Sequence, residues 1–422
     1  MNTTEAMTYI EQRNALGSVL GLDNIKELLK RLGNPQDQCR VVHIAGTNGK
    51  GSILAYMDQV LQCNGYRTGR YSSPTIFTYL ERFQINGRNM PEPELAGYVT
   101  QVAEAVEEME TNGVPRVTAF EIETAVAFLY FLREQVDVVL LETGMGGRLD
   151  ATNVVQKPLC TILASISLDH MRILGDTVAK IAEEKVGILR EGVPCVVYPV
   201  NEEALPVIRK RCERLAAPLI LPDLQQLRVQ SEDLHWETFD YKNVNYKISL
   251  LGEYQIYNAI TALEALQSIE KQLKNGLKKV DIQRGLEITQ WKGRFEVLCR
   301  APYIIRDGAH NLDAARQLYR QITKHFTNRR ILYIIGVLGD KQHKEMLRLL
   351  LPLAWKTYVL TVPENPRAYQ AEALAAEAAE YCPRVEITGS PEQAYERARQ
   401  EAAADDVIIA FGSLYYIGRI GE

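Results

Sequence analysis

Residues 41–52, with the sequence VVHIAGTNGKGS, combine a short apolar stretch with a glycine-rich loop, a lysine and a hydroxyl group. Glycines let backbone N–H groups approach phosphate oxygens, and a helix that begins at the loop adds a favourable dipole. Lys50 would supply a positive charge for the β- and γ-phosphates, and Ser52 a hydroxyl for a phosphate or Mg²⁺. The pattern departs from G-x-x-x-x-G-K-[ST] because Gly51 separates Lys50 from Ser52. We expect a phosphate-binding loop; the alternative is an ordinary glycine-rich turn.

Two further apolar stretches end in side chains that can do chemistry. Residues 136–141 lead to Glu142, and residues 160–166 lead to Asp169 and His170. Continuous apolar runs of this kind are typical of parallel strands buried on both faces. Ligands bind at the carboxyl ends of such strands, where P-loop enzymes place a metal-binding acid. We therefore expect these groups to meet the phosphate loop, although histidine is an unusual Mg²⁺ ligand and a structural role for His170 is the alternative.

Helices must hold these strand ends in place. After the loop, apolar residues recur at helical spacing up to a predicted C-terminal cap at Asn64-Gly65. Residues 118–133 predict a helix that is apolar around most of its circumference, so Glu121 and Glu123 stand out. Both can lie on an exposed flank of this helix, and we expect that position for Glu123. Another helix is predicted over residues 259–268.

The last third of the chain predicts a second α/β unit. Residues 220–250 have an irregular pattern that favours β-strands. Further along the chain, strands are expected near 303–307, 331–336, 357–361, 385–388 and 406–411, with helices between them. The first of these strands ends in DGAHN, residues 307–311, which again places polar groups at a strand end. A turn followed by a helix cap is the alternative for this motif. The predicted fold is α/β, with a domain of parallel-sheet type at residues 1–292 and a smaller, Rossmann-like α/β domain at 293–422.

Composition excludes several classes of protein. The 422 residues are 46% hydrophobic and 24% charged, and the net charge of −5 argues against a general surface for nucleic acid or anionic membranes. Seven cysteines without a C-x-x-C pair indicate neither a disulfide framework nor a cysteine zinc site, and they favour a cytoplasmic location. We expect no signal peptide and no membrane-spanning segment.

Seven motifs, in this order along the chain, resemble those of the folylpolyglutamate synthases, which belong to the Mur-ligase-like ATP-dependent amide ligases: AGTNGKGS, SSP, LETGMGGRLDATN, SLDH, EEKVGIL, WKGRFE and DGAHN. The resemblance extends from GLDNIKELLKRLGNPQ, before the phosphate loop, to FGSLYYIG near the end. It implies a P-loop ATP-binding domain at residues 1–292, of the kind found at the centre of Mur ligases, and a C-terminal glutamate-ligase domain at 293–422. It also implies a monomer.

The resemblance assigns roles to individual residues. The predicted ATP-binding residues are Gly49, Lys50, Gly51, Ser52, Asn258, Arg294 and Asp307. The predicted Mg²⁺ ligands are Ser73, Glu142 and His170. The predicted contacts to the pterin substrate are Thr118, Ala119, Phe120, Glu121, Leu149, Asp150 and Ala151. The predicted catalytic residues are Lys50, Lys185 and His310.

Lys185 matches a lysine that is carboxylated in this family, and its carbamate would help to hold a second Mg²⁺. Carboxylation requires a neutral amine, hence a lysine whose pKa is lowered by its surroundings. From the sequence alone, a solvated helix lysine beside Glu183 and Glu184 is the favoured interpretation.

The implied reaction joins L-glutamate to a folate at the expense of ATP, through an acyl phosphate. The form GGRLDATN resembles bifunctional bacterial members, which also make dihydrofolate from dihydropteroate and glutamate. Two departures from the family pattern are Thr75, where histidine is common, and Leu312, where proline often follows DGAHN. The first bears on the geometry of the pterin or metal site.

Three alternatives remain at this point. One is a monofunctional folylpolyglutamate synthase. Another is a cell-wall Mur ligase, which usually carries an additional N-terminal domain for a nucleotide sugar, whereas the phosphate loop here begins near residue 45. The third is a nucleotide-dependent switch or binding protein without ligase activity.

Overall fold

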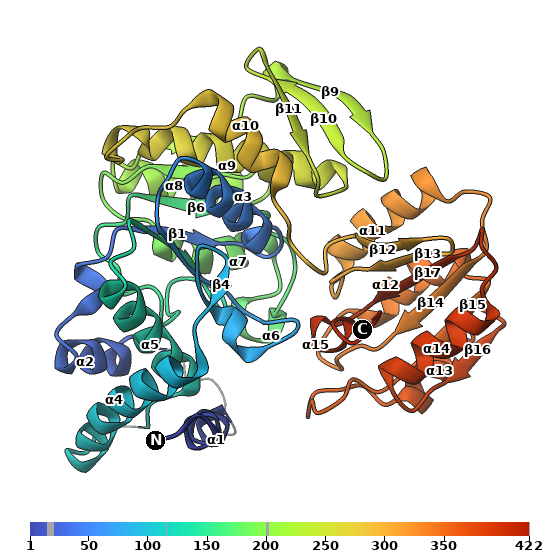
Figure 1. Ribbon diagram of the computed structural model, residues 1–422, viewed down its shortest axis with the longest axis horizontal. Coiled ribbons are helices and arrows are strands. Elements are labelled where there is room, and N and C mark those ends of the chain that lie inside the picture. The colour runs from blue at the N-terminus through green and yellow to red at the C-terminus, as the bar shows by residue number, and fades with distance from the viewer. Residues whose placement is uncertain (15–20, 115, 200–201, 422) are drawn as a thin grey trace.

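The computed structural model describes residues 1–14, 21–114, 116–199 and 202–421, and the chain forms two lobes (Figure 1). The sheet of the larger lobe has eight described strands, in the order β4 (Arg88–Asn89), β3 (Phe83–Ile85), β2 (Thr68–Tyr71), β5 (Val138–Glu142), β1 (Val41–Ala45), β6 (Cys160–Leu163), β7 (Cys195–Val197) and β8 (Leu219–Ile220). Six neighbouring strands run parallel, namely β2, β5, β1, β6, β7 and β8. Strands β3 and β4 add an antiparallel hairpin at the β2 edge.

The described helices of the larger lobe are α1 (Thr3–Asn14), α2 (Asp23–Arg31), α3 (Lys50–Cys63), α4 (Glu92–Thr111), α5 (Ala119–Arg133), α6 (Met171–Leu174), α7 (Val178–Lys185), α8 (Leu205–Arg214), α9 (Glu253–Ile269) and α10 (Lys279–Ile288). Three of them correspond to helices predicted from the sequence, and α5 matches the predicted residues 118–133 to within one residue. Helix α3 ends at Cys63 and has Asn64 as its C-cap, with Gly65 in the left-handed region, as the sequence predicts. Helix α9 begins at Glu253, earlier than the predicted start at residue 259, so Asn258 lies within the helix.

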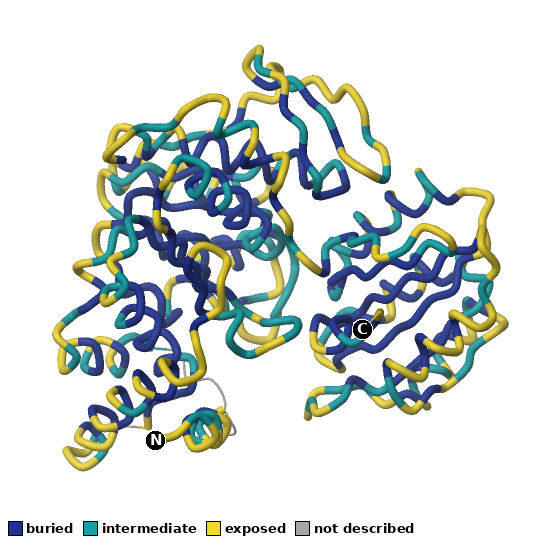
Figure 2. The backbone as a smooth tube through the Cα atoms, in the orientation of Figure 1, coloured by how far each residue is buried: buried dark blue, intermediate teal, exposed yellow. Residues whose placement is uncertain are grey.

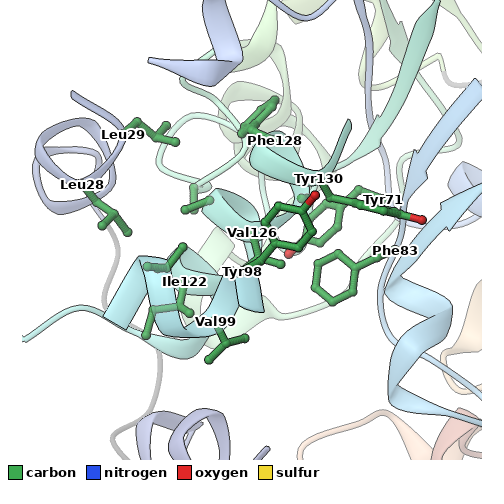
Figure 3. Close-up of a cluster of buried hydrophobic side chains, with 14 of the residues drawn as sticks. Leu28, Leu29, Tyr71, Phe83, Tyr98, Val99, Ile122, Val126, Phe128 and Tyr130 are labelled. Carbon is green, nitrogen blue, oxygen red and sulfur yellow. The ribbon is translucent and has the colours of Figure 1, made fainter. Parts of the chain in front are cut away.

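Both faces of the large sheet are covered, which explains its continuous apolar strands. In β1, Val41 packs into a cluster with residues of α1, α2, α4 and α5, whereas Val42 and Ile44 pack into a cluster with residues of α3, α9 and α10. Figure 3 shows part of the first cluster, where α2, α4 and α5 bring aliphatic and aromatic side chains together. Figure 2 shows the central strands of this sheet buried and the outer helix faces exposed. This arrangement confirms the predicted parallel strands.

The smaller lobe repeats this layering with a six-stranded sheet. Its strands are ordered β12 (Glu296–Arg300), β13 (Tyr303–Arg306), β17 (Val407–Phe411), β14 (Ile331–Ile335), β15 (Lys356–Val359) and β16 (Val385–Ile387). Only β12 pairs antiparallel. The helices are α11 (Leu312–His325), α12 (His343–Leu350), α13 (Ala371–Ala378), α14 (Pro391–Glu401) and α15 (Leu414–Ile417). All five strands predicted in this part of the chain are confirmed.

The β-rich segment before the smaller lobe is also confirmed. It forms a three-stranded antiparallel sheet of β11 (Val244–Ile248), β10 (Glu237–Tyr241) and β9 (Leu227–Glu232), at the top of Figure 1. None of the helices in the described part of the chain combines the length and the apolar composition that a membrane crossing requires.

Candidate active site

The phosphate loop connects β1 to α3, and its glycines have physical reasons to be glycine. Gly49 is the N-cap of α3 with φ 88°, a conformation that side chains rarely adopt. A Cβ at Gly49 would lie 2.6 Å from Asn258 Oδ1, and a Cβ at Gly51 would lie 2.6 Å from the ring of Trp291. The loop therefore follows a tight path at the N-terminus of a helix, where backbone N–H groups favour an anion.

Lys50 lies beside the acid predicted to bind metal. Its Nζ is 3.6 Å from Glu142 Oε1 and donates to the carbonyl oxygens of Gly46 (3.1 Å) and Thr47 (3.3 Å). Glu142 ends β5, which pairs directly with β1, and it is only 5% exposed. Burial raises the pKa of the Glu142 carboxyl, against the opposing effect of Lys50 and Arg294. The prediction that Glu142 meets the phosphate loop is confirmed.

A cavity of about 430 Å³ lies between the two lobes. Both lobes contribute to its lining, and they bring together twelve of the predicted site residues: Gly49, Lys50, Gly51, Ser52, Ser73, Glu142, His170, Lys185, Asn258, Arg294, Asp307 and His310. The order of strands explains the convergence within the larger lobe, because β5, β1 and β6 are neighbours and their carboxyl ends open on the same edge.

The predicted pterin contacts do not line this cavity but adjoin it. Phe120 packs so closely on Gly144, which does line it, that a Cβ at Gly144 would lie 2.5 Å from the Phe120 ring. Asp150 accepts a hydrogen bond from the backbone N–H of Met145 (2.8 Å) and so fixes the same glycine-rich loop. The side chains of Thr118 and Glu121 are engaged in the N-terminal capping box of α5. Leu149 and Ala151 flank Asp150, and Ala119 begins α5.

The expected exposure of Glu123 is wrong. Glu123 is 2% exposed, accepts a hydrogen bond from the Tyr79 hydroxyl (2.9 Å) and pairs with Arg82 at 3.2 Å. Burial raises the pKa of Glu123, whereas Arg82 acts to lower it. The partners of this carboxylate come from the segment after Ser73, which the pattern of the helix itself cannot reveal.

Lys185 is likewise buried, so the solvated interpretation of this lysine is wrong. Only 3% of it is exposed, and its Nζ donates to the carbonyl oxygen of Gly46 at 2.8 Å. Burial, together with the charge of Lys50, lowers the pKa of Lys185 to about 7. A substantial fraction of neutral amine is therefore present near neutral pH, as carboxylation requires.

The side chains around the cavity could supply some of the ligands of a hard cation such as Mg²⁺, and water and substrate phosphates would supply the others. No group of three or more His, Cys, Asp and Glu side chains within the described ranges is arranged to hold a metal ion by itself. Ser73 and Glu142 offer oxygen atoms, which Mg²⁺ prefers, and this ion usually keeps several waters and binds substrate phosphates. Burial and Lys341 lower the pKa of His170 to about 4, which leaves its imidazole neutral at pH 7.

The smaller lobe presents a compact set of polar groups to the cavity. Asp307, at the end of β13, is 6% exposed and accepts from the backbone N–H groups of Phe295 (2.7 Å) and Ala309 (2.8 Å). Burial raises the pKa of Asp307, and Arg294 opposes the shift. His310 Nδ1 lies 2.7 Å from the Gly308 carbonyl oxygen, which directs Nε2 towards the larger lobe.

Several contacts that join the lobes are not predictable from the sequence. Asp169 Oδ1 lies 2.6 Å from Lys341 Nζ, and Asp169 Oδ2 lies 3.7 Å from His310 Nε2. These neighbours hold the pKa of Asp169 far below its usual range, despite the opposing effect of burial. Asn48, within the phosphate loop, hydrogen-bonds to Asn311. Asp169 was recognised as part of a strand end, but no local pattern marks Lys341 as its partner.

Gln255 was also missed. Its side chain is fully buried, donates to Ser52 Oγ at 3.3 Å and accepts from Asn258 Nδ2 at 2.9 Å. It therefore links the predicted nucleotide contact on α9 to the phosphate loop.

Comparisons with known proteins give a consistent result. Residues 44–266 match the model of the Mur ligase middle domain, and residues 293–414 match that of the Mur ligase glutamate ligase domain. The Bacillus subtilis protein named dihydrofolate synthase/folylpolyglutamate synthase is 35% identical, over 99% of this chain and 97% of the relative.

Solved structures agree with the sequence comparisons. Folylpolyglutamate synthase from Thermotoga maritima is 32% identical with a TM-score of 0.85, covering 99% of this chain and 95% of that one. Escherichia coli FolC in complex with DHPP and ADP is 29% identical with a TM-score of 0.87, covering 99% and 96%.

Proposed function

Since this chain belongs to the dihydrofolate synthase and folylpolyglutamate synthase family of Mur ligases, and is therefore an ATP-dependent ligase, we propose that it adds L-glutamate both to tetrahydrofolate and to dihydropteroate. The similar proteins of Bacillus subtilis and Escherichia coli are both named dihydrofolate synthase/folylpolyglutamate synthase, which supports both activities. The glycine-rich loop that buried Asp150 holds in place, beside Phe120 and next to the cavity, supports the pterin side of the assignment.

In the first step, a substrate carboxylate attacks the γ-phosphorus of ATP, which gives an acyl phosphate and releases ADP. The backbone of residues 49–52 and the ammonium group of Lys50 stabilise the charge on the transferring phosphoryl group. Arg294 and Asp307 reach the same cavity from the smaller lobe, and Asn258 from α9, so we assign these three residues to the nucleotide.

We assign Mg²⁺ binding to Ser73, Glu142 and His170, with a carboxylated Lys185 contributing to a second Mg²⁺. When bound, these ions neutralise phosphate charge and orient the γ-phosphate. The hydrogen bond from Lys185 Nζ to the carbonyl oxygen of Gly46, at the start of the phosphate loop, supports this assignment.

In the second step, the amine of L-glutamate attacks the acyl phosphate carbon, and inorganic phosphate leaves. His310, held at 3.7 Å from Asp169, is the residue we assign to this step. An acyl phosphate hydrolyses in water, so a cavity closed by both lobes protects it. We place the boundary between the two domains at residues 292 and 293, and we propose a cytoplasmic monomer with no nucleic-acid or membrane partner.

The observation that carries the proposal is the arrangement of Lys50, 3.6 Å from Glu142, in a cavity that Arg294 and Asp307 complete from the other lobe. The test is ATP-dependent incorporation of labelled glutamate, with dihydropteroate and tetrahydrofolate supplied separately. We expect labelled product with each acceptor. Product with tetrahydrofolate alone would show that the enzyme is a monofunctional folylpolyglutamate synthase. No product with either acceptor would refute the proposal.

A further inference from the structure

Asn311, the last residue of the DGAHN motif, has a side chain whose hydrogen-bonding capacity is completely used. It is 1% exposed and is the N-cap of α11, where its Oδ1 accepts from the backbone N–H of Ala314 at 2.9 Å. The same oxygen accepts from Asn48 Nδ2 at 3.2 Å, and Asn311 Nδ2 donates to Asn48 Oδ1 at 3.0 Å and to Asp169 Oδ2 at 3.3 Å. Two donors and two acceptor positions are therefore occupied.

Both partners of this amide in the larger lobe belong to the active site. Asn48 is part of the phosphate loop, and its Nδ2 also donates to Asp313 Oδ2 at 2.9 Å, in the first turn of α11. Asp169 Oδ2, which accepts from Asn311, is the oxygen that lies 3.7 Å from His310 Nε2. One side chain of the smaller lobe thus contacts both the loop that receives phosphate and the carboxylate beside the predicted catalytic histidine.

We propose that Asn311 is the positioning residue that couples closure of the two lobes to the conformation of the phosphate loop. The coupling acts through Asn48 and Asp169, and it rests on the proposed function because it concerns the closed complex in which glutamate is transferred. A helix cap alone needs only the acceptor oxygen of Asn311. Its two donated hydrogen bonds have no role in α11 and serve the contact between lobes.

The variant Asn311→Asp separates these two roles. Aspartate is as good an N-cap as asparagine, so α11 keeps its cap. The substitution removes both donors and places a carboxylate against Asp169 and against Asn48 Oδ1. We expect kcat for glutamate addition to fall by about 10- to 100-fold, because hydrogen bonds to a buried polar and a charged partner are lost. Wild-type turnover by Asn311→Asp would overturn the inference, since it would reduce the role of Asn311 to capping.

A matched control is Ser390→Ala, which removes a comparable cap in the same lobe. Ser390 is the N-cap of α14 and accepts from the backbone N–H of Gln393. This variant is expected to lower the unfolding midpoint without changing kcat. An equal loss of kcat in Ser390→Ala would mean that any weakened cap in this lobe impairs turnover, which contradicts the specific role of Asn311.

A double-mutant cycle tests the contact itself. Asn311→Ser keeps an N-cap oxygen but is too short to reach Asn48, and Asn48→Ala removes the other side of the pair. If the two residues act together, the double variant should lose about as much kcat/KM as the worse single variant. Losses that multiply would show that the two residues act independently and would overturn the inference.

Nucleotide binding distinguishes failure of this inference from failure of the proposed function. Calorimetry with β,γ-methylene ATP and Mg²⁺ needs no ligase activity, and the cavity has walls from both lobes. We expect Asn311→Asp to bind the analogue at least about fivefold more weakly than the wild type. If Asn311→Asp shows this loss of affinity but the wild type makes no amide product, the proposed function is refuted and the coupling is supported. Unchanged affinity would refute the coupling even in an active ligase.

Discussion

Lys50 and Lys185 donate to the same backbone oxygen, the carbonyl of Gly46. Two ammonium groups on one acceptor repel each other, which is one cause of the lowered pKa of Lys185. Glu142 pairs with Lys50 at 3.6 Å and does not appear among the charges that shift the pKa of Lys185. Conversion of Lys185 to a carbamate would replace one of the two cations by an anion, and this relieves the repulsion at the base of the phosphate loop.

Lys50→Ala is predicted to abolish turnover. The variant removes the only lysine of the phosphate loop, and loss of one preorganised group that stabilises transition-state charge costs at least about 100-fold in kcat. Phosphate release in the complete assay measures this effect. Lys274→Ala, which removes an exposed lysine paired with Asp137, is the control and should be fully active. An unimpaired Lys50→Ala enzyme would remove the phosphate loop from the mechanism.

Lys185→Ala is predicted to lose most activity and to recover part of it when formate or acetate is added. The truncated side chain leaves a buried space beside Gly46, which a small carboxylate can enter to replace the carbamate. Activity is measured as a function of carboxylate concentration, with Lys50→Ala as a variant that should not respond. If carboxylates fail to rescue an inactive Lys185→Ala enzyme, Lys185 does not act as a carbamate.

At the scale of elements, neighbouring parallel strands explain why the motifs meet. The phosphate loop, Glu142 and the segment that carries His170 follow β1, β5 and β6, which are adjacent in the sheet. Helix α9 adds Asn258, and its start depends on the three-stranded sheet, because Glu237 in β10 accepts a hydrogen bond from the backbone N–H of Gly252, the N-cap of α9.

Glu237→Gln is predicted to remove a pH dependence of stability. Glu237 is fully buried, and burial raises its pKa from 4.5 to about 8, with Glu232 and Glu253 adding to the shift and Lys324 opposing it. Between about pH 4.5 and 8 the folded protein keeps a proton that the unfolded chain releases, so this group's contribution to stability falls as pH rises through that range. The neutral amide carries no such penalty.

The measurement is thermal unfolding of both proteins at pH 5.5 and pH 8. We expect Glu237→Gln to be more stable than the wild type at pH 8, by an amount on the order of 2 kcal/mol, and to exceed it by a clearly smaller amount at pH 5.5. An equal difference at both pH values would show that Glu237 does not titrate in this range.

The elements that carry motifs were predictable from the sequence, and several contacts between elements were not. Strand periodicity and the polar residues at strand ends indicated which groups would share the cavity. Glu123 was misplaced because the pattern of a single helix does not show that Tyr79 and Arg82 supply its partners. Asn48 and Asn311 are separated by 263 positions, and their pairing depends on how the two lobes meet, which no local pattern contains.

At the scale of the whole molecule, the segment after Ser73 connects the lobes. Ile76, from the larger lobe, packs against the hydrophobic cluster of the smaller lobe that contains Ile417. The ring of Phe77 lies 4.6 Å from the guanidinium carbon of Arg306. Because Ser73 lines the cavity, a shift of this segment would change the site as well as the contact between lobes.

Gly418→Ala is predicted to impair catalysis through this contact. A Cβ at Gly418 would lie 2.5 Å from the backbone oxygen of Ile76, so the segment must move away. A displacement of about 1 Å near a catalytic site can lower the reaction rate about 100-fold. We expect kcat/KM for the pterin acid to fall by at least about tenfold. Steady-state kinetics provide the measurement, with Gly97→Ala in α4 as the control, because nothing lies within 4 Å of a Cβ there. Normal kinetics in Gly418→Ala would show that the segment does not need this position.

A substrate carboxylate that becomes an acyl phosphate in the cavity between the lobes must give up one oxygen atom to the phosphate, and oxygen labelling measures this transfer. The pterin acid is prepared with ¹⁸O in its reacting carboxylate, and the phosphate released during glutamate addition is analysed by mass spectrometry. We expect one ¹⁸O atom in each phosphate, because a carboxylate oxygen leaves with the phosphoryl group, and the other ¹⁸O in the amide carbonyl. Unlabelled phosphate, or ¹⁸O recovered in AMP, would contradict this mechanism.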